Sequence, residues 1–331
     1  GYVEWQHEQK LAENLSLTAQ LNWWKDSEIL RDFRPRAFFP VQEPDTFVEA
    51  TYAGANTLVS LFARFQPNSF QRVQERLPEL RFDLLPLSIG NGFYERFNAS
   101  VAVLREDPPL GGPRLSSNRF DAYYSLSRPF THGDWLSFSP VAGARVTHYV
   151  NSTGITGTST TTRTLGEVGF DAALRSSATW DYKNSLWKID GLRHLLTPRM
   201  TYRYIPEAGK GAGHIAAIDR RTFATYLPPL SLGDQRNLDD LTATNTLRIG
   251  FDNTLQTRDA VYGSRDLLTF NIANDFRFQR APGERDVSAV HTELALAPAA
   301  WVSVDVYQSF APQSFTLREF NSGITLRDGA V

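Results

Sequence analysis

Cysteine is absent from this chain of 331 residues, and methionine occurs only once. Without cysteine, the stretch can form no disulfide framework and no thiolate metal site. An excess of charge of either sign is also lacking, because 34 Lys and Arg residues balance 36 Asp and Glu residues to a net charge of −2. Such a balance argues against nucleic acid as a partner.

Long hydrophobic runs are missing as well. No window approaches 18 consecutive apolar residues, so the sequence predicts no transmembrane helix. A membrane protein is still possible, because a barrel strand places its apolar residues at every second position and produces no continuous run.

The sequence also lacks the motifs of common enzyme and metal chemistry. Its six histidines form no HExxH pair or other close metal spacing, and there is no GxSxG elbow, Walker loop or GxGxxG. A Ser–His hydrolase built around His148, which lies among Ser and Thr residues, is a much weaker interpretation than a histidine near a membrane interface. We therefore expect neither an enzyme nor a cofactor or metal site.

The chain is rich in strands whose side chains alternate between apolar and polar. Between Asp266 and Phe278 the even positions are mostly apolar, as in Leu268 and Phe270, whereas the odd positions include Asp275 and Arg277. Successive side chains of a strand point to opposite faces. Strands of roughly ten residues with one apolar face are typical of a transmembrane β-barrel.

About fifteen such strands are expected, and no segment has a convincing helical period. Their approximate ranges are 2–12, 15–24, 46–53, 57–65, 79–89, 93–105, 119–128, 135–150, 163–180, 194–205, 245–257, 265–279, 287–296, 301–310 and 316–327. The fold class predicted is all-β, a large antiparallel up-and-down transmembrane barrel, of which this chain is a part.

The links between these strands alternate between short and long. Many short ones carry Gly or Asn, as in Gly90-Asn91-Gly92, and the long ones include 25–45 and 206–244; segment 181–193 is intermediate where a short link is expected. Outer-membrane barrels have short periplasmic turns and longer external loops. We therefore expect the 25–45 and 206–244 loops to lie outside the cell.

Aromatic residues are abundant, and several tryptophans lie near the ends of expected strands. Trp23, Trp24, Trp135, Trp180, Trp187 and Trp301 are the examples. Such amphipathic rings favour the two interfaces of a bilayer.

The parity of each strand assigns its side chains to a lipid face or a lumen face. The expected outward set includes Val101, Val103, Phe138, Val146, Met200, Tyr204, Leu247 and Phe251. The lumen-facing candidates for contact with a substrate or a plug are Arg96, Asn98, Arg145, Arg199, Arg203, Arg248, Asp252, Asp275 and Arg277. For any one of them, the simpler interpretation is a solvated wall position, because charged side chains usually lie in water.

The long loop 206–244 contains three carboxylates that deserve a separate interpretation. Asp219, Asp239 and Asp240 offer the oxygen ligands that a hard cation prefers. Loop carboxylates are more often simply solvated, and we expect that here.

Five segments, in the same order, resemble the LptD family of lipopolysaccharide-assembly proteins, also called organic solvent tolerance proteins. They are 25–33 (KDSEILRDF), 77–83 (LPELRFD), 138–149 (FSPVAGARVTHY), 195–206 (LLTPRMTYRYIP) and 238–250 (LDDLTATNTLRIG). The more specific parts are the LxPxxxYxYxP strand and the LDxLxxxNxLRxG strand start. The resemblance covers nearly the whole chain.

The resemblance implies a function and a set of partners. Family members carry a periplasmic jelly-roll followed by a barrel of about 26 strands that is plugged by the lipoprotein LptE. Lipopolysaccharide arrives along a periplasmic bridge of LptA-like proteins, and it is translocated and inserted into the outer leaflet of the Gram-negative outer membrane. On this basis residues 1–331 are expected to be a single β-barrel domain, a fragment without the jelly-roll and the final strands. Its other expected contacts are outer-membrane lipids.

Two other classes of function stay open at this point. A passive porin or nutrient-receptor barrel would have the same strand pattern. A soluble, carbohydrate-binding β-sandwich would also be rich in strands and aromatic residues.

Overall fold

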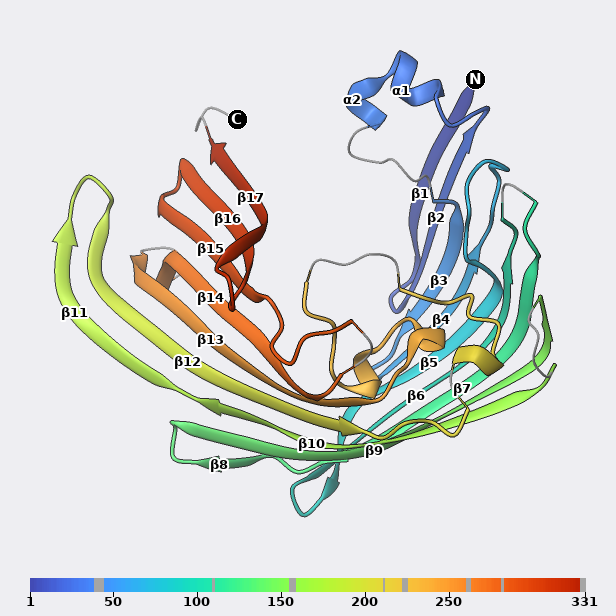
Figure 1. The fold of residues 1–331 in the computed structure, drawn as a ribbon. Coiled ribbons are helices and arrows are strands. Elements are labelled where there is room, and N and C mark those ends of the chain that lie inside the picture. The colour runs from blue at the N-terminus through green and yellow to red at the C-terminus, as the bar shows by residue number, and fades with distance from the viewer. Residues whose placement is uncertain are drawn as a thin grey trace.

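A computed structural model describes residues 1–38, 45–108, 111–154, 159–210, 212–221, 226–259, 263–280 and 283–327. Their strands form one sheet of 17 strands. Strand neighbours pair antiparallel in chain order, from β1 with β2 to β16 with β17. Figure 1 shows the sheet as an open, strongly curved arc, with β1 and β17 on opposite sides of its hollow. The fold class is therefore the all-β, up-and-down sheet that the alternating pattern predicts.

The strands and short helices have the following bounds. The strands are β1 (Tyr2–Ala12), β2 (Leu15–Trp24), β3 (Phe47–Ala53), β4 (Thr57–Arg64), β5 (Glu75–Gly90), β6 (Phe93–Glu106), β7 (Leu115–Ser127), β8 (Phe130–His132), β9 (Leu136–Thr153), β10 (Thr161–Leu174), β11 (Ser176–Asn184), β12 (Ile189–Ile205), β13 (Thr244–Asp259), β14 (Gly263–Gln279), β15 (Val290–Ala299), β16 (Val302–Ala311) and β17 (Thr316–Leu326). The helices are α1 (Ile29–Phe33), α2 (Pro35–Phe38), η1 (Ala212–His214), η2 (Leu232–Asp234) and η3 (Leu238–Asp240).

Two of the 17 strands continue another strand along the same crossing of the sheet. After β7, the short β8 pairs with the first residues of the same neighbour, β9. In the same way β10 pairs with the second half of β12 and β11 with its first half. The 17 strands therefore make fifteen crossings, as the sequence predicts.

The links at one edge of the sheet are tight. The segment 181–193, intermediate in the sequence, proves to be a short hairpin, because β11 continues to Asn184 and β12 begins at Ile189. Lys188 in this turn has a φ of 49°, the left-handed conformation that tight hairpin turns require. The links at the opposite edge are longer, with one exception: the turn 312–315 between β16 and β17 has four residues.

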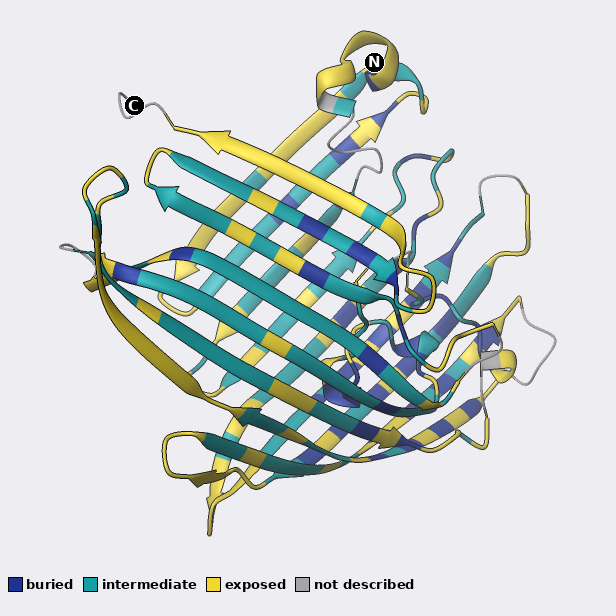
Figure 2. Ribbon diagram, turned by 60° about the vertical axis from the view of Figure 1, so that its left-hand side comes forward, coloured by how far each residue is buried: buried dark blue, intermediate teal, exposed yellow. Residues whose placement is uncertain are grey.

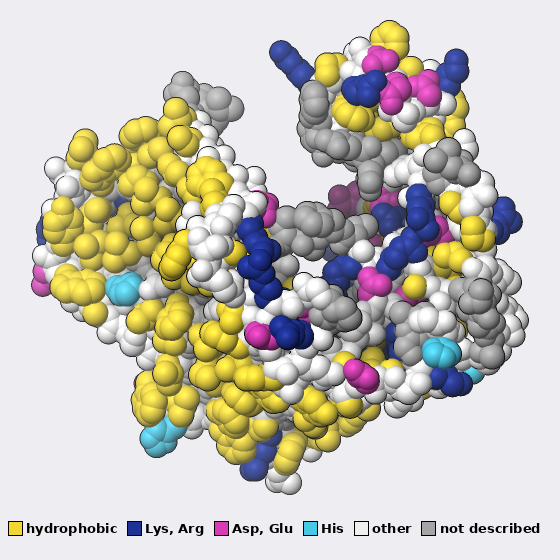
Figure 3. All heavy atoms as spheres, viewed as in Figure 1, with side chains coloured by type: hydrophobic (Ala, Val, Ile, Leu, Met, Phe, Trp, Pro, Cys, Tyr) yellow, Lys and Arg dark blue, Asp and Glu magenta, His cyan; other side chains and the backbone are white. Residues whose placement is uncertain are grey.

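The outer face of the sheet is apolar and open to its surroundings. Val101, Met200 and Phe251, all expected to point outward, are 53%, 41% and 42% exposed. In Figure 3, hydrophobic side chains crowd the outer surface at the left and below, whereas charged side chains gather at the hollow. An exposed apolar surface of this extent marks a protein or membrane contact.

Tryptophans lie near both edges of this outer surface. Trp135, Trp180, Trp187 and Trp301 lie in or near the short links, and the rings of Trp187 and Trp301 stack with 6.5 Å between centroids. Trp5 and Trp23 lie toward the opposite edge, where β1 begins and β2 ends. The arrangement matches the aromatic girdles of a membrane-spanning sheet.

The link between β12 and β13 turns into the hollow, and we call residues 206–243 the inner segment. Its described parts contain η1, η2 and η3 and lie against the concave side of the sheet (Figure 1). Figure 2 shows the contrast in burial: β11 and β17 are almost wholly exposed, whereas buried residues concentrate where the inner segment packs. Within the described ranges, no helix has the length and hydropathy to cross a membrane.

Substitutions on the two faces of β13 test whether the outer face contacts lipid. Phe251 lies at the middle of this strand on the outer face, and Thr254 lies on the inner face. Phe251→Arg is expected to destabilise the protein in lipid vesicles by about 2–4 kcal/mol, the cost of a cation at the bilayer midplane. Thr254→Arg is the matched control and should cost much less. Equal unfolding midpoints in urea for the two variants would contradict a lipid-facing outer surface.

Candidate functional site

The inner segment is held first by apolar side chains. Leu232, Leu238 and Leu241 pack with Tyr123 and Leu165 of the wall in one buried cluster. A second cluster joins Ala216 and Ile218 of the segment to Ala102 and Leu104 of β6. These wall residues occupy inward positions, where the alternating pattern otherwise places polar side chains. The segment therefore covers the apolar patch of an otherwise hydrophilic inner face.

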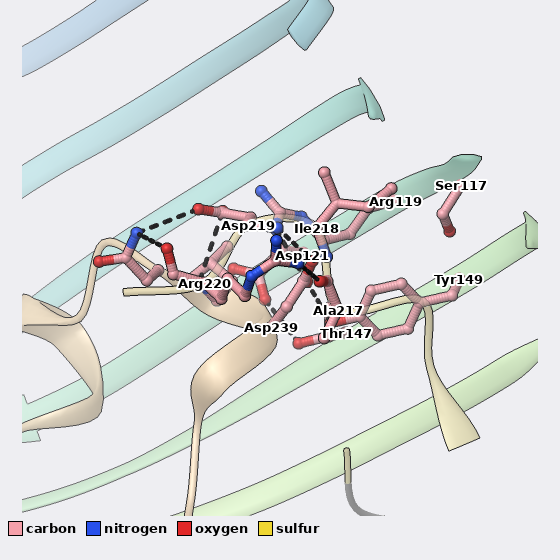
Figure 4. Close-up of polar contacts among 12 residues, drawn as sticks. Ser117, Arg119, Asp121, Thr147, Tyr149, Ala217, Ile218, Asp219, Arg220 and Asp239 are labelled. Carbon is pink, nitrogen blue, oxygen red and sulfur yellow. Dashed lines mark hydrogen bonds and ion pairs between the residues drawn. The ribbon is translucent and has the colours of Figure 1, made fainter. Parts of the chain in front are cut away.

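A buried arginine lies at the centre of the charged network (Figure 4). Arg119 on β7 donates one hydrogen bond to Asp219 over 2.7 Å and another to Asp239 over 3.1 Å. All three side chains are at most 1% exposed. Because a buried charge is costly unless it is paired, the two segment carboxylates and this arginine depend on one another.

Further donors complete the coordination of both carboxylates. Asp239 accepts hydrogen bonds from the hydroxyl of Tyr149 and from the backbone N–H groups of Ile218 and Asp219, over 2.7–2.9 Å. Asp219 also accepts from Arg76 over 3.0 Å. Two turns of the inner segment are thus joined to each other and to strands β5, β7 and β9.

A second group of polar contacts holds η2. Glu167 on β10 accepts from the backbone N–H of Leu232 over 2.6 Å and from the hydroxyl of Ser231 over 2.9 Å. Arg145 on β9 donates to the carbonyl of Leu232 over 2.7 Å. The next residue, Gly233, lies close to the wall, because a Cβ there would lie 2.7 Å from the ring of Tyr123.

The two central carboxyls differ in their affinity for a proton. Burial alone would raise the pKa of Asp219, but the guanidinium groups of Arg119 and Arg76 outweigh burial and hold that pKa below its ordinary value. Burial raises the pKa of Asp239.

Six of the nine candidates from the sequence take part in these contacts, directly or through one partner. Arg96 donates to the carbonyl of Gly233 and pairs with Asp234, and Arg145 also donates to Asp121 and Asn98. Arg203 bonds Glu167 and Asp171, and Arg248 donates to the carbonyl of Pro228 over 2.7 Å.

The sixth, Asp275, takes part through Arg248, and the other three candidates lie on the same inner face with different partners. Asp275 pairs with Arg248 over 2.7 Å. Asp252 pairs with Arg199, whose side chain is largely exposed. Arg277 donates to the carbonyl of Arg285, in the link after β14. All nine thus have polar partners, and a role in contacting a substrate or a plug remains a proposal.

Two expectations from the sequence prove wrong in this region. Asp219 and Asp239 are buried and bonded to arginine, whereas the sequence suggested solvated loop carboxylates. The segment 206–244, expected as an external loop, leaves the long-link edge and folds back into the hollow (Figure 1). The physical reason is its content of Ile215, Ile218, Leu232 and Leu238, which bury apolar surface against the wall.

Several residues that hold the inner segment were not among the candidates. They include Arg76, Arg119, Tyr149 and Glu167, and also Arg163 on β10, which donates to the backbone carbonyls of Leu238 and Asp239. A signal for them exists in the sequence. The inner segment is too rich in Ile and Leu for a solvated loop, and the inward positions Leu104, Tyr123 and Leu165 interrupt the polar face of their strands. Together these features predict an apolar contact between the segment and β6, β7 and β10.

The charged network around Arg119 is better suited to holding the inner segment in place than to catalysis. In the described part of the chain, no three His, Asp or Glu side chains converge to hold a metal ion. His148, the basis of the hydrolase alternative, lies on the outer face, where its Nδ1 is 2.8 Å from the hydroxyl of Thr162. The network instead fastens a long link to a strand wall.

An up-and-down sheet with an apolar outer face, tryptophans at its edges and a charged inner face defines the class of strand-built outer-membrane proteins. The family model of LptD, LPS transport system D, matches residues 1–330, and the chain belongs to this family. Membership assigns it to lipopolysaccharide transport to the outer membrane, in a family of transport barrels rather than enzymes. A comparison with curated protein sequences returns no match.

Removing the central arginine should release the inner segment. Arg119→Ala leaves Asp219 and Asp239 buried without their shared cation, which is expected to cost about 3–5 kcal/mol. Trypsin should then cut the protein faster after Arg220, Arg221 and Arg236, with the cleavage sites located by mass spectrometry. Arg199→Ala is the control, because the ion pair of Arg199 with Asp252 lies within the wall. Unchanged cleavage in Arg119→Ala would show that the network does not hold the segment.

Proposed function

We propose that this chain forms part of the wall of a lipopolysaccharide translocon, which inserts the lipid into the outer leaflet of the Gram-negative outer membrane. The observation that carries the proposal is the division of one sheet into an apolar outer face and a charged, hydrogen-bonding inner face, in a chain of the LptD family.

The physical support comes from the nature of the transported molecule. Lipopolysaccharide joins acyl chains to a hydrophilic saccharide, so its two ends need different surroundings. Acyl chains are stable against an apolar surface, whereas saccharide hydroxyls need hydrogen-bond partners. The two faces of this sheet provide these surroundings on either side of one wall. Such a role needs no catalytic group in the chain.

Depletion of the gene in cells tests this function directly. Lipopolysaccharide should accumulate before it reaches the outer leaflet, and reintroduction of the intact gene should restore it, as measured by surface labelling with an antibody to the saccharide. A passive porin or nutrient receptor would give the opposite pattern, with normal surface lipopolysaccharide and slower solute uptake. That pattern would refute the translocon proposal.

We further propose that an LptE-like lipoprotein occupies part of the hollow and that LptA-like proteins deliver lipopolysaccharide from the periplasm. The inner face supports the first contact through the ion pair of Arg199 and Asp252. The Arg199 side chain is 63% exposed and that of Asp252 is 35% exposed, so both can reach a partner. Arg203 is more deeply buried, and its guanidinium is taken up by Glu167 and Asp171.

Charge reversal at this exposed pair tests the lipoprotein contact. Arg199→Glu should reduce recovery of the lipoprotein in co-purification by about two- to fivefold, the range expected for an exposed charge contact. A second variant, Arg199→Glu with Asp252→Arg, restores an ion pair within the wall but presents the reversed charges to the partner. It should show the same loss. Full recovery with the double variant would mean that only the internal pair matters.

A further inference from the structure

An arginine on the outer face lies over two aromatic rings at the short-link edge of the sheet. Arg128 belongs to the link between β7 and β8, near the lower edge of the sheet in Figure 1. Its Cζ lies 5.1 Å from the ring centroid of Phe93 and 4.8 Å from that of Phe130. Its backbone N–H donates to the carbonyl of Pro140 over 3.2 Å, which joins the link to β9. The two rings and this hydrogen bond hold the cation at one position on a largely apolar surface.

The charge of Arg128 is not matched by a carboxylate. The Arg128 side chain is exposed, and it forms no hydrogen bond or ion pair with any residue that the structure describes. Glu95 lies on the same face, two residues after Phe93 on β6, but its carboxylate accepts a hydrogen bond from the hydroxyl of Tyr124 over 3.1 Å. Aromatic rings accept no conventional hydrogen bond, so the N–H donors of the guanidinium remain available to an anion. A guanidinium matches the geometry of a phosphate especially well.

A row of aromatic rings leads from this arginine across the outer face. Phe130 lies directly opposite Phe138 in the register of β8 and β9, so their side chains share one face. The ring of Phe138 lies 5.3 Å from that of Phe170 on β10, which lies 5.8 Å from that of Tyr202 on β12. Phe278, near the end of β14 at the long-link edge, continues the row at 6.5 Å from Tyr202. We call these five residues the aromatic row. It forms an apolar strip between the two edges of the sheet.

A cation at one end of an apolar strip matches the two parts of a phospholipid. The headgroup phosphate of such a lipid is an anion that a guanidinium binds with two parallel hydrogen bonds. Its acyl chains are stable against apolar side chains, and flat rings provide a large contact area. Short links are the periplasmic turns of an outer-membrane sheet, so Arg128 lies on the side of the periplasmic leaflet. Lipopolysaccharide, which also carries phosphate, is inserted into the other leaflet.

We propose that Arg128, Phe93 and Phe130 form a binding site for an anionic glycerophospholipid of the periplasmic leaflet. The phosphate binds the guanidinium of Arg128, and one acyl chain lies along the aromatic row over Phe138 and Phe170. The site is on the outer face, away from the inner segment, and it does not depend on the translocon proposal. A soluble anion would bind Arg128 without any use of the aromatic row, and this difference separates the two kinds of ligand.

Lipid binding to the full-length protein in a neutral detergent tests the headgroup contact. Dioleoyl phosphatidylglycerol is titrated and the bound lipid is counted by native mass spectrometry, with zwitterionic dioleoyl phosphatidylcholine for comparison. The parent protein should prefer phosphatidylglycerol. Arg128→Gln should weaken its binding about tenfold, the loss of one charge-assisted contact, whereas Arg128→Lys keeps the charge and should lose less. Arg175→Gln is the matched control: Arg175 is exposed at the same edge, where its N–H donates to the carbonyl of Trp135, and no ring in the described part of the chain lies against its guanidinium.

The same assay tests the contact of the acyl chain. Phe138→Ala removes apolar surface from the aromatic row and should weaken binding of dioleoyl phosphatidylglycerol severalfold. Binding of dihexanoyl phosphatidylglycerol should stay unchanged in this variant, because its short chains do not extend along the row. Equal effects of Phe138→Ala on the two lipids would contradict the proposed path of the chain.

Four results would overturn the site itself. Equal binding of phosphatidylglycerol by Arg128→Gln and the parent protein would exclude the headgroup contact. An equal loss in Arg175→Gln would show a general attraction of anions to this edge. Displacement of the lipid by inorganic phosphate would assign Arg128 to a soluble anion, and a preference for lipopolysaccharide over phosphatidylglycerol would assign it to the wrong lipid. Each of these results leaves the translocon proposal intact, because that proposal is tested by surface lipopolysaccharide after gene depletion.

Discussion

This structure depends on one constraint: the outer face of each strand must carry no charged side chains in its central part. A cation at the bilayer midplane on the lipid side costs about 2–4 kcal/mol, whereas the inner face has no such restriction. Neighbouring residues of β13 show the result, because Phe251 is exposed on the outer face and Asp252 pairs with Arg199 on the inner face. The charged residues that strands of this protein carry in their central parts are therefore concentrated on one side.

Concentrating charge on the inner face creates a second requirement, which the inner segment meets. When Leu232, Leu238 and Ile218 pack on the wall, they remove nearby arginines from water. Those arginines then need partners, and the same segment provides Asp219 and Asp239 for Arg119. These contacts join residues 100 and 120 positions apart. Apolar contact and ion pairing thus favour the same docked arrangement.

The fold was largely predictable from the sequence, because the alternation of side chains acts over each strand separately. The number of crossings follows from the number of alternating runs. The outward position of Val101 or Phe251 follows from parity, which needs no knowledge of distant contacts. The turn between β11 and β12 was harder to predict, because its residues 185–188 include no Gly or Asn, the usual residues of a hairpin turn.

The candidate site was only half predictable. Parity correctly assigned Arg96 and Arg145 to the inner face, but it could not show that a loop more than 80 residues later in the chain would cover them. Local patterns treat a loop as solvated by default, and the burial of Asp219 and Asp239 depends on arginines contributed by other strands. Two departures from the usual patterns indicate this contact. The loop contains apolar residues, and the polar face of the wall contains apolar residues such as Tyr123.

The docked segment makes the two halves of the inner face unequal. Against β6–β10 the face is filled, because the segment buries both apolar clusters and the Arg119 network there. Over β14–β17 the face is hollowed, with Glu293 and Asp305 exposed. By packing against β6–β10, the inner segment restricts any hydrophilic path along this arc to the other parts of the inner face.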